Sequence, residues 1–138
     1  MARYVVDASV AAKWFVAEPH SEIALTLVTG PHDLVAPSFI LAELGSVFLK
    51  KVSSGDMSVE TAMRNFRTVE AGMELIWTME QQDAAFVLAR RYNRSFYDSL
   101  YVALAVAEGC QLVTADERLY NALAPEVAGT MLWIADLP

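Results

Sequence analysis

Cysteine, histidine and long apolar runs are scarce in this chain, and each shortage excludes a class of protein. The single cysteine, Cys110, excludes an internal disulfide framework and a zinc site built from several cysteines. Neither His20 nor His32 lies beside an acidic motif, so we assign them no catalytic role. The longest apolar run ends at Ala107 and falls far short of the roughly 20 residues that cross a bilayer. Charged residues interrupt the apolar N-terminal segment, a poor match to a secretory signal, so we expect a cytoplasmic protein.

Basic residues are also in the minority. Ten lysines and arginines face seventeen aspartates and glutamates, which gives a net charge of −7. Nucleic-acid phosphates favour basic partners, so this balance alone argues against binding of DNA or RNA. Bound divalent cations would offset much of the excess. Any contact with nucleic acid is therefore expected to depend on metal ions and on a local basic patch.

Short apolar runs alternate with amphipathic segments along the whole chain. Strands are predicted at residues 3–6, 33–36, 74–78, 111–114 and 131–134. Helices are predicted at residues 10–16, 20–29, 38–54, 58–72, 79–93, 95–108 and 117–123, with Ser38 and Ser58 as N-caps. This alternation is typical of an α/β fold with a parallel sheet that helices cover on both faces. The length and the absence of linkers favour a single domain over residues 1–138.

Four acidic residues stand where an apolar segment ends or where a buried helix is expected: Asp7, Glu43, Asp98 and Asp116. Carboxylates are rarely buried unless they are paired or bind a metal ion. Asp7 closes the first strand, where it suits both a helix N-cap and a metal ligand at the carboxyl end of a central strand. Ser9 adds a hydroxyl near the same strand end.

Glu43 and Asp98 lie on predicted helices. The neighbours of Glu43 on its helix face are mostly apolar, so this carboxylate either has a partner or extends from the edge of the face to water. Glu43 is expected to lie beyond the first turn of its helix. Asp98 has the capping-box spacing after Ser95, yet the helix that it opens is apolar nearly all round and is expected to be buried.

Asp116 follows the fourth strand. Thr114 and Glu117 form a capping box there, which leaves the Asp116 carboxylate free for another role. The alternative is a solvated acid in the first turn of the next helix, where the helix dipole favours negative charge.

The four acids converge if the sheet is doubly wound. Asp7 and Asp116 then flank the crevice where the strand order reverses, and helix starts bring Asp98 and Glu43 to the same rim. Such a group needs a cation or a proton to stay together. Its all-oxygen ligands suit Mg²⁺ or Mn²⁺, which predicts metal-assisted phosphodiester chemistry.

Four motifs in this order, VVDASV, PSFILAEL, YDSLYVALA and LVTADERL, resemble those of the PIN-domain ribonucleases, and most of all the VapC toxins of toxin–antitoxin pairs. The likeness covers nearly the whole chain. It implies a PIN-domain-like (Rossmannoid) α/β/α sandwich with a five-stranded parallel sheet, and Mg²⁺- or Mn²⁺-dependent endoribonuclease activity on RNA. It also implies a cognate VapB-like antitoxin, and we expect a homodimer.

The resemblance assigns the acidic site of the family to Asp7, Glu43, Asp98 and Asp116, and its supporting hydroxyls to Ser9 and Thr114. We expect Asp7, Asp98 and Asp116 to be direct or water-mediated metal ligands. Glu43 either binds the metal as well or orients the attacking water.

Three arginines, Arg90, Arg91 and Arg94, lie just upstream of Asp98 and are predicted to contact RNA phosphates. Arg90 and Arg94 share one helix face. The alternative is an ordinary solvated, charged face.

Other acidic phosphate-handling sites fit the sequence less well. A phosphoacceptor receiver domain needs adjacent acids after its first strand and a lysine near its last, whereas MLWIADLP has none. A haloacid-dehalogenase-type phosphatase needs Asp-x-Asp, and this chain has Asp7 followed two residues later by Ser9. The remaining alternative is a PIN-fold RNA-binding or housekeeping RNA-processing module without a toxin role.

Overall fold

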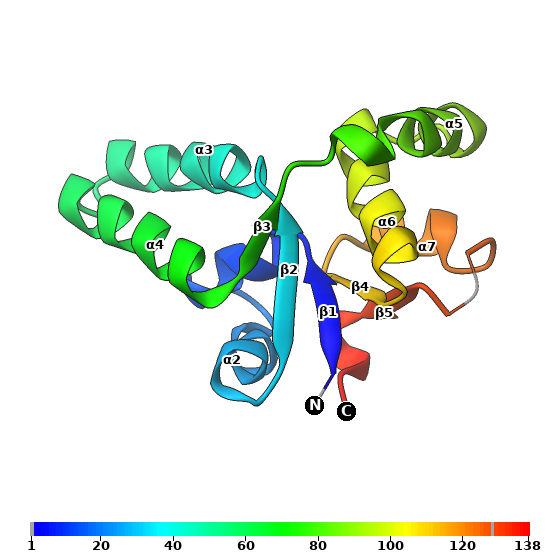
Figure 1. The fold of residues 1–138 in the computed structure, drawn as a ribbon. Helices are drawn as coiled ribbons and strands as arrows, with labels where there is room; N and C mark the ends of the chain where they lie inside the picture. Colours follow the sequence, from blue (N-terminus) through cyan, green and yellow to red (C-terminus); the bar gives the residue numbers. More distant parts are fainter. Residues whose placement is uncertain (1, 128) are drawn as a thin grey trace.

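Strands and helices alternate along the chain in the computed structural model, which describes residues 2–127 and 129–138 (Figure 1). The strands are β1 (Arg3–Val6), β2 (Asp33–Pro37), β3 (Glu74–Ile76), β4 (Gln111–Thr114) and β5 (Met131–Trp133). The α-helices are α1 (Ala8–Ala11), α2 (Ser21–Thr29), α3 (Ile40–Ser53), α4 (Val59–Gly72), α5 (Gln82–Tyr92), α6 (Phe96–Glu108) and α7 (Glu117–Leu123). Short 3₁₀ turns are η1 (Ala12–Trp14), η2 (Met79–Gln81) and η3 (Ile134–Asp136).

The five strands form one parallel sheet in the order β3-β2-β1-β4-β5. Val5 at its centre is in register with Val35 on one side and Leu112 on the other. Because parallel crossovers are right-handed, the reversal of direction after β3 places the later helices on the opposite face from the earlier ones. The predicted α/β/α arrangement with a five-stranded parallel sheet is confirmed.

The core lies between the sheet and α6. That helix packs across β1, β2 and β4, and each residue from Ser99 to Ala105 is buried. Val6 and Val113 are fully buried on their strands. Each such apolar side chain contributes about 1.5–3 kcal/mol relative to an exposed position. The prediction of a buried central helix is confirmed, and this packing fixes the start of α6 at the sheet edge where Asp98 lies.

Several helix starts agree with the sequence prediction. Ser58 accepts a hydrogen bond from the Thr61 backbone at the start of α4, and Ser95 accepts one from the Asp98 backbone at the start of α6. Gly109 ends α6 in the left-handed conformation, with φ of 64°, which glycine adopts without steric cost.

Another helix start differs from the prediction because a hydrogen bond to a distant residue changes it. Ser38 does not cap α3, since its backbone N–H donates to the Ile76 carbonyl beside β3 at 2.8 Å. Phe39 holds the N-cap position instead and makes no side-chain capping bond. Glu43 therefore lies in the first turn of α3, not beyond it.

The remaining shifts are shorter. The predicted helix over 10–16 is α1 followed by η1, and the helix over 79–93 opens with η2. The strands predicted at 74–78 and 131–134 end two residues and one residue earlier. Within residues 2–127 and 129–138, none of the helices has the length and hydropathy that crossing a bilayer requires.

Candidate active site

The four acids reach one edge of the sheet from four different elements. Asp7 directly follows β1 and Asp116 comes just after β4, and these two strands pair at the centre of the sheet. The strand order reverses there, since β2 lies on one side of β1 and β4 on the other. Asp98 and Glu43 lie in the first turns of α6 and α3. Open α/β sheets bind their ligands in the crevice at this point.

Asp7 is the buried member of the group, with 5% of its surface exposed. Its Oδ1 accepts hydrogen bonds from Ser9 Oγ at 2.5 Å and from the Val10 backbone at 3.1 Å, and its Oδ2 accepts one from Thr114 Oγ1 at 2.5 Å. Burial raises the pKa of Asp7 to about 6, against the lowering effect of these three bonds. Asp7 does cap α1, but its burial goes well beyond what a helix cap requires.

Asp98 connects the other three acids electrostatically. Besides burial, the negative charge of Asp98 raises the pKa of Asp7 and of Glu43. The pKa of Asp98 itself is raised by burial and then by the charge of Asp116. A side-chain hydrogen bond from Ser95 and the positive charge of Arg94 act in the opposite direction and lower the pKa of Asp98. The four carboxylates share one environment, in which a cation or a proton must offset the repulsion.

Tyr101 is a member of this site that the sequence reading missed. Its hydroxyl donates a 2.6 Å hydrogen bond to Glu43 Oε1, and only 2% of the residue is exposed. Burial and the Glu43 charge raise the pKa of Tyr101, so the hydroxyl stays protonated and remains a donor. Burial raises the pKa of Glu43 as well, and the bond from Tyr101 lowers it. The available signal was spacing, because Tyr101 follows Asp98 by three residues on α6.

The capping box predicted at Thr114 and Glu117 is wrong. Asp116 is the N-cap of α7, and its Oδ1 accepts a hydrogen bond from the Leu119 backbone at 3.2 Å. Thr114 is fully buried and donates to Asp7 instead, while its oxygen accepts from the Asp116 backbone at 3.0 Å. The Thr114 hydroxyl is thus the link between the two strand ends that carry the acids.

Ser9 makes a second link between these strand ends. Its Oγ donates to Asp7 and accepts from the Ala115 backbone at 3.0 Å. A cavity of about 340 Å³ opens beside it and is lined in part by Glu43, Lys13 and Glu18. The Lys13 ammonium lies 3.4 Å from Glu18, and its side chain is only 10% exposed. The site therefore has one cation at its border that the sequence reading left out.

The oxygen atoms of these side chains suit a hard divalent cation, but the side chains are too far apart to form a complete ligand shell by themselves. The donors are carboxylate oxygens, which Mg²⁺ and Mn²⁺ prefer. Among the described residues, however, no three acidic, histidine or cysteine side chains come close enough to hold one ion. Mg²⁺ keeps several waters in most protein sites and often binds through only one or two carboxylates. An ion held here would need water molecules to complete its coordination.

The three nominated arginines occupy different surroundings. Arg90 and Arg91 are exposed in the last turn of α5. Arg94 is partly buried, and its positive charge acts against the rise in the pKa of Asp98 caused by burial and by Asp116. Only Arg94 is thus seen to act on the acidic group, and the other two lie on an exposed helix end.

Comparisons with known proteins agree with this fold. The chain belongs to the PIN domain family, which matches residues 4–123. Ribonuclease VapC1 of Mycobacterium tuberculosis (strain CDC 1551 / Oshkosh) is 30% identical over 115 residues, which cover 83% of this chain and 86% of that protein.

Solved structures share the fold at low sequence identity. PAE2754 from Pyrobaculum aerophilum superimposes with a TM-score of 0.73 at 20% identity, over 97% of this chain and 85% of the other. A toxin–antitoxin complex from Klebsiella pneumoniae gives a TM-score of 0.65 at 12% identity, over 97% of this chain and 99% of the other. At such identities the likeness supports the fold alone.

Proposed function

We propose that this chain is an Mg²⁺- or Mn²⁺-dependent endoribonuclease that hydrolyses RNA phosphodiester bonds and serves as the VapC-like toxin of a toxin–antitoxin pair. The observation that carries the proposal is the group of four electrostatically coupled carboxylates at the switch point of a PIN-domain sheet. The relative named Ribonuclease VapC1 supports the activity.

The residues divide into three roles in this proposal. Asp7, Asp98 and Asp116 are direct or water-mediated metal ligands, and Glu43 binds the metal or orients the attacking water. Ser9 and Thr114 hold the Asp7 carboxylate by one short hydrogen bond to each oxygen. When bound, a divalent ion supplies Lewis acidity toward the scissile phosphate and lowers the pKa of a bound water.

The partners follow from the same proposal. We expect a VapB-like antitoxin, since the Klebsiella pneumoniae neighbour is a toxin–antitoxin complex. A homodimer, a cytoplasmic location, and one PIN domain over residues 1–138 complete the proposal. Arg90, Arg91 and Arg94 are its candidate contacts to RNA phosphates.

Incubation of the purified chain with total RNA tests the activity. We expect cleavage with Mg²⁺ or Mn²⁺, none with EDTA, and defined cut ends on mapping. Asp7→Asn keeps the shape of the side chain and removes its charge, so it should lower the cleavage rate by at least about a hundredfold, as loss of a metal ligand would. Glu117→Gln is the matched control, because Glu117 is exposed in the first turn of α7, next to Asp116.

The outcomes separate the candidate functions. Cleavage by Asp7→Asn at the unmodified rate would contradict the assignment of the site. RNA binding without cleavage by any form would favour the alternative, a PIN-fold RNA-binding module. Cleavage without growth arrest in cells that express the chain would favour housekeeping RNA processing over a toxin role.

A further inference from the structure

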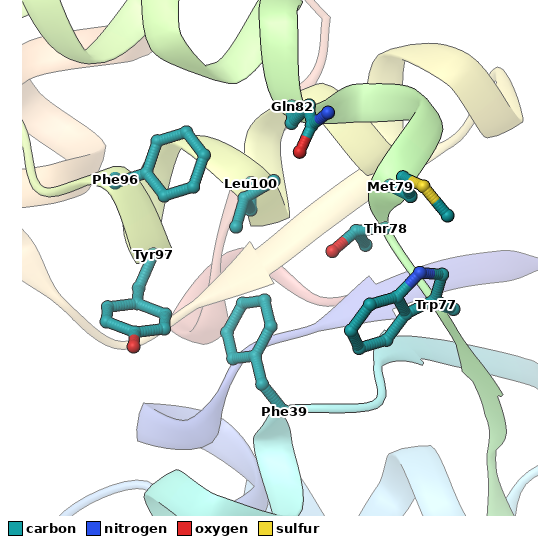
Figure 2. Close-up of a pocket in the computed structure, with 8 residues that line it drawn as sticks. All are labelled: Phe39, Trp77, Thr78, Met79, Gln82, Phe96, Tyr97 and Leu100. Carbon is teal, nitrogen blue, oxygen red and sulfur yellow. The ribbon is translucent and has the colours of Figure 1, made fainter.

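A second cavity, of about 260 Å³, lies beside the acidic site and is built largely from aromatic rings (Figure 2). Its walls include Phe39, Trp77, Phe96 and Tyr97, and Leu100 lies between them. Trp77 is 73% exposed and Tyr97 is 57% exposed, which is unusual for such large apolar side chains. Exposed aromatic groups on one concave surface mark a binding site more often than chance.

Polar groups without partners also face this aromatic cavity. Figure 2 shows the Thr78 hydroxyl directed toward the space between the rings and the Gln82 amide at its rim. Neither side chain makes a hydrogen bond within the described part of the chain. None of the eight lining residues carries a charge, although the protein as a whole has a net charge of −7. The cavity therefore offers flat apolar walls together with a hydrogen-bonding edge.

Direct contacts connect this aromatic cavity to the acids. Tyr97 immediately precedes Asp98 on α6. The Phe39 ring lies 5.1 Å from the Tyr97 ring and 5.2 Å from the Tyr101 ring, measured between centroids. Tyr101 in turn donates its hydroxyl hydrogen to Glu43. A group bound between the rings would lie next to the carboxylates.

The charges around the aromatic cavity suit a phosphate chain that continues beyond it. Arg90 lines a neighbouring cavity of about 440 Å³ together with Phe96 and Phe86. Arg94 carries a positive charge within range of Asp98. Both cations come from the segment that leads into α6.

We propose that the aromatic cavity binds one unpaired base of the RNA, next to the phosphate that is cut. This inference rests on the proposed nuclease function. Single-stranded bases stack on aromatic side chains and hydrogen-bond through their edges, whereas bases inside an A-form duplex are not available for this. Trp77 and Tyr97 supply the stacking faces, and Thr78 and Gln82 the edge contacts. The substrate class is accordingly RNA with an unpaired nucleotide at the cleavage site.

A binding experiment tests the aromatic cavity without relying on cleavage. The probe is a fluorescein-labelled oligo(A) dodecamer, measured by anisotropy with Mg²⁺ in the Asp7→Asn background, and a self-complementary RNA duplex of equal length is the comparison. We expect Trp77→Leu to weaken oligo(A) binding about 5- to 150-fold, the range for loss of one base–aromatic stack. The salt dependence should not change, because no charge is removed.

Two variants control for loss of aromatic surface in general. Trp77→Phe keeps a stacking face and should bind oligo(A) within about threefold of its parent. Phe66→Leu removes a partly buried ring of α4 that lines neither this cavity nor the one beside Arg90, and should have equally little effect. Trp77 fluorescence, taken as the difference between the parent and Trp77→Phe, should be quenched by oligo(A) and not by the duplex.

Three results would overturn the inference. One is binding of oligo(A) by Trp77→Leu at the parental affinity, and another is equal affinity of the parent for duplex and oligo(A). The third is loss of RNA affinity together with dissociation of a dimer in sedimentation, which would assign this surface to a second copy of the chain. Absence of RNA cleavage by the unmodified chain would contradict the proposed function but leave the binding result intact. If Trp77→Leu binds oligo(A) as its parent does while the unmodified chain cleaves RNA, the base site is excluded and the proposed nuclease function is retained.

Discussion

The hydroxyl of Tyr101 donates a 2.6 Å hydrogen bond to Oε1 of Glu43 across 58 positions of sequence. This contact joins α6, which carries Asp98, to α3 at the edge of the sheet. The hydrogen bond from Tyr101 favours the ionised form of Glu43. Burial of Glu43 and the negative charge of Asp98 favour its neutral form. Within residues 2–127 and 129–138, Tyr101 is the only hydroxyl that donates to the Glu43 carboxylate, so it opposes burial and Asp98 in setting the ionisation of Glu43.

Tyr101→Phe should raise the pKa of Glu43 further while it keeps the ring contact with Phe39. The acid limb of the pH–rate profile for RNA cleavage should then move to higher pH, because Glu43 is ionised over a narrower range. Loss of one hydrogen bond to a charged group should lower the free energy of unfolding by about 1.5–3 kcal/mol at neutral pH. A profile that falls in amplitude without shifting along the pH axis would show that Tyr101 has a packing role only.

Thr114 provides a test of how Asp7 is held. Thr114→Val is close to isosteric and removes both the donor to Asp7 and the acceptor for the Asp116 backbone. The pKa of Asp7 should rise above its value of about 6, since a bond that lowers it is lost. The buried Asp7 carboxylate and the partly buried Asp116 backbone N–H each lose a partner, so the free energy of unfolding should fall by about 2–4 kcal/mol. Thr114→Ser keeps the hydroxyl and should retain most of both stability and activity in denaturant titration and RNA cleavage.

Local rules predicted the features of this protein that depend on near neighbours in sequence. Ser58 and Ser95 cap their helices as expected, because each hydroxyl reaches a backbone N–H three residues on. The same rule failed at Thr114, where the hydroxyl bonds to Asp7 across 107 positions and leaves the cap to Asp116. At the end of a central strand, a hydroxyl can bond either to the next helix start or to a residue on a neighbouring strand. The second kind of partner is known only once the sheet is assembled.

The position of the four acids at one edge of the sheet could be predicted, but the side chains that contact them could not. Asp7 and Asp116 were predicted to meet because parallel strands end at one edge. Tyr101 and Lys13 escaped notice because each lies in an otherwise apolar stretch, and spacing alone does not say what a hydroxyl or ammonium contacts. Their partners, Glu43 and Glu18, emerge only from packing in three dimensions.

Asp98→Asn should separate stability from activity. The negative charge of Asp98 raises the pKa of both Asp7 and Glu43, so its removal should lower both values. Stability in EDTA at neutral pH should rise by about 1 kcal/mol, since less repulsion remains between partly solvated charges. RNA cleavage should be lost, because Asp98 is a proposed metal ligand. A variant that is both less stable in EDTA and inactive would show that Asp98 serves the fold instead.

The nominated arginines should differ in their effects on RNA. Arg94 lies within electrostatic range of Asp98, whereas Arg91 is an exposed helix-end residue. Arg94→Ala should weaken RNA binding and reduce the salt slope by about one, as loss of a phosphate contact does. Arg91→Ala should have the smaller effect on affinity measured across a salt series. If neither Arg94→Ala nor Arg91→Ala changes RNA affinity, these arginines do not contact RNA and form an ordinary solvated face.

Metal and pH should act on stability through the same carboxylate. The folded protein holds the Asp7 proton more tightly than an unfolded chain does, with a pKa of about 6 against 3.8. The stability that this group contributes is therefore complete below about pH 3.8 and is lost as pH rises through 6. In EDTA, the unfolding free energy of the unmodified chain relative to that of Asp7→Asn should fall by about 1–2 kcal/mol between pH 5 and pH 7.5. Comparison with Asp7→Asn removes the contribution of the other carboxylates.

Mg²⁺ or Mn²⁺ should reverse this loss, because an ion that binds the ionised group stabilises the folded state by mass action. At a hundred times its dissociation constant the ion adds about 2.7 kcal/mol. Protons compete with metal for the same oxygens, and with a pKa of about 6 only about a tenth of Asp7 is ionised at pH 5, so the gain in melting temperature should fall to about half of its value at pH 7.5. A gain that is independent of pH, or that persists in Asp7→Asn, would place the ion elsewhere on this acidic protein and would exclude Asp7 as its ligand.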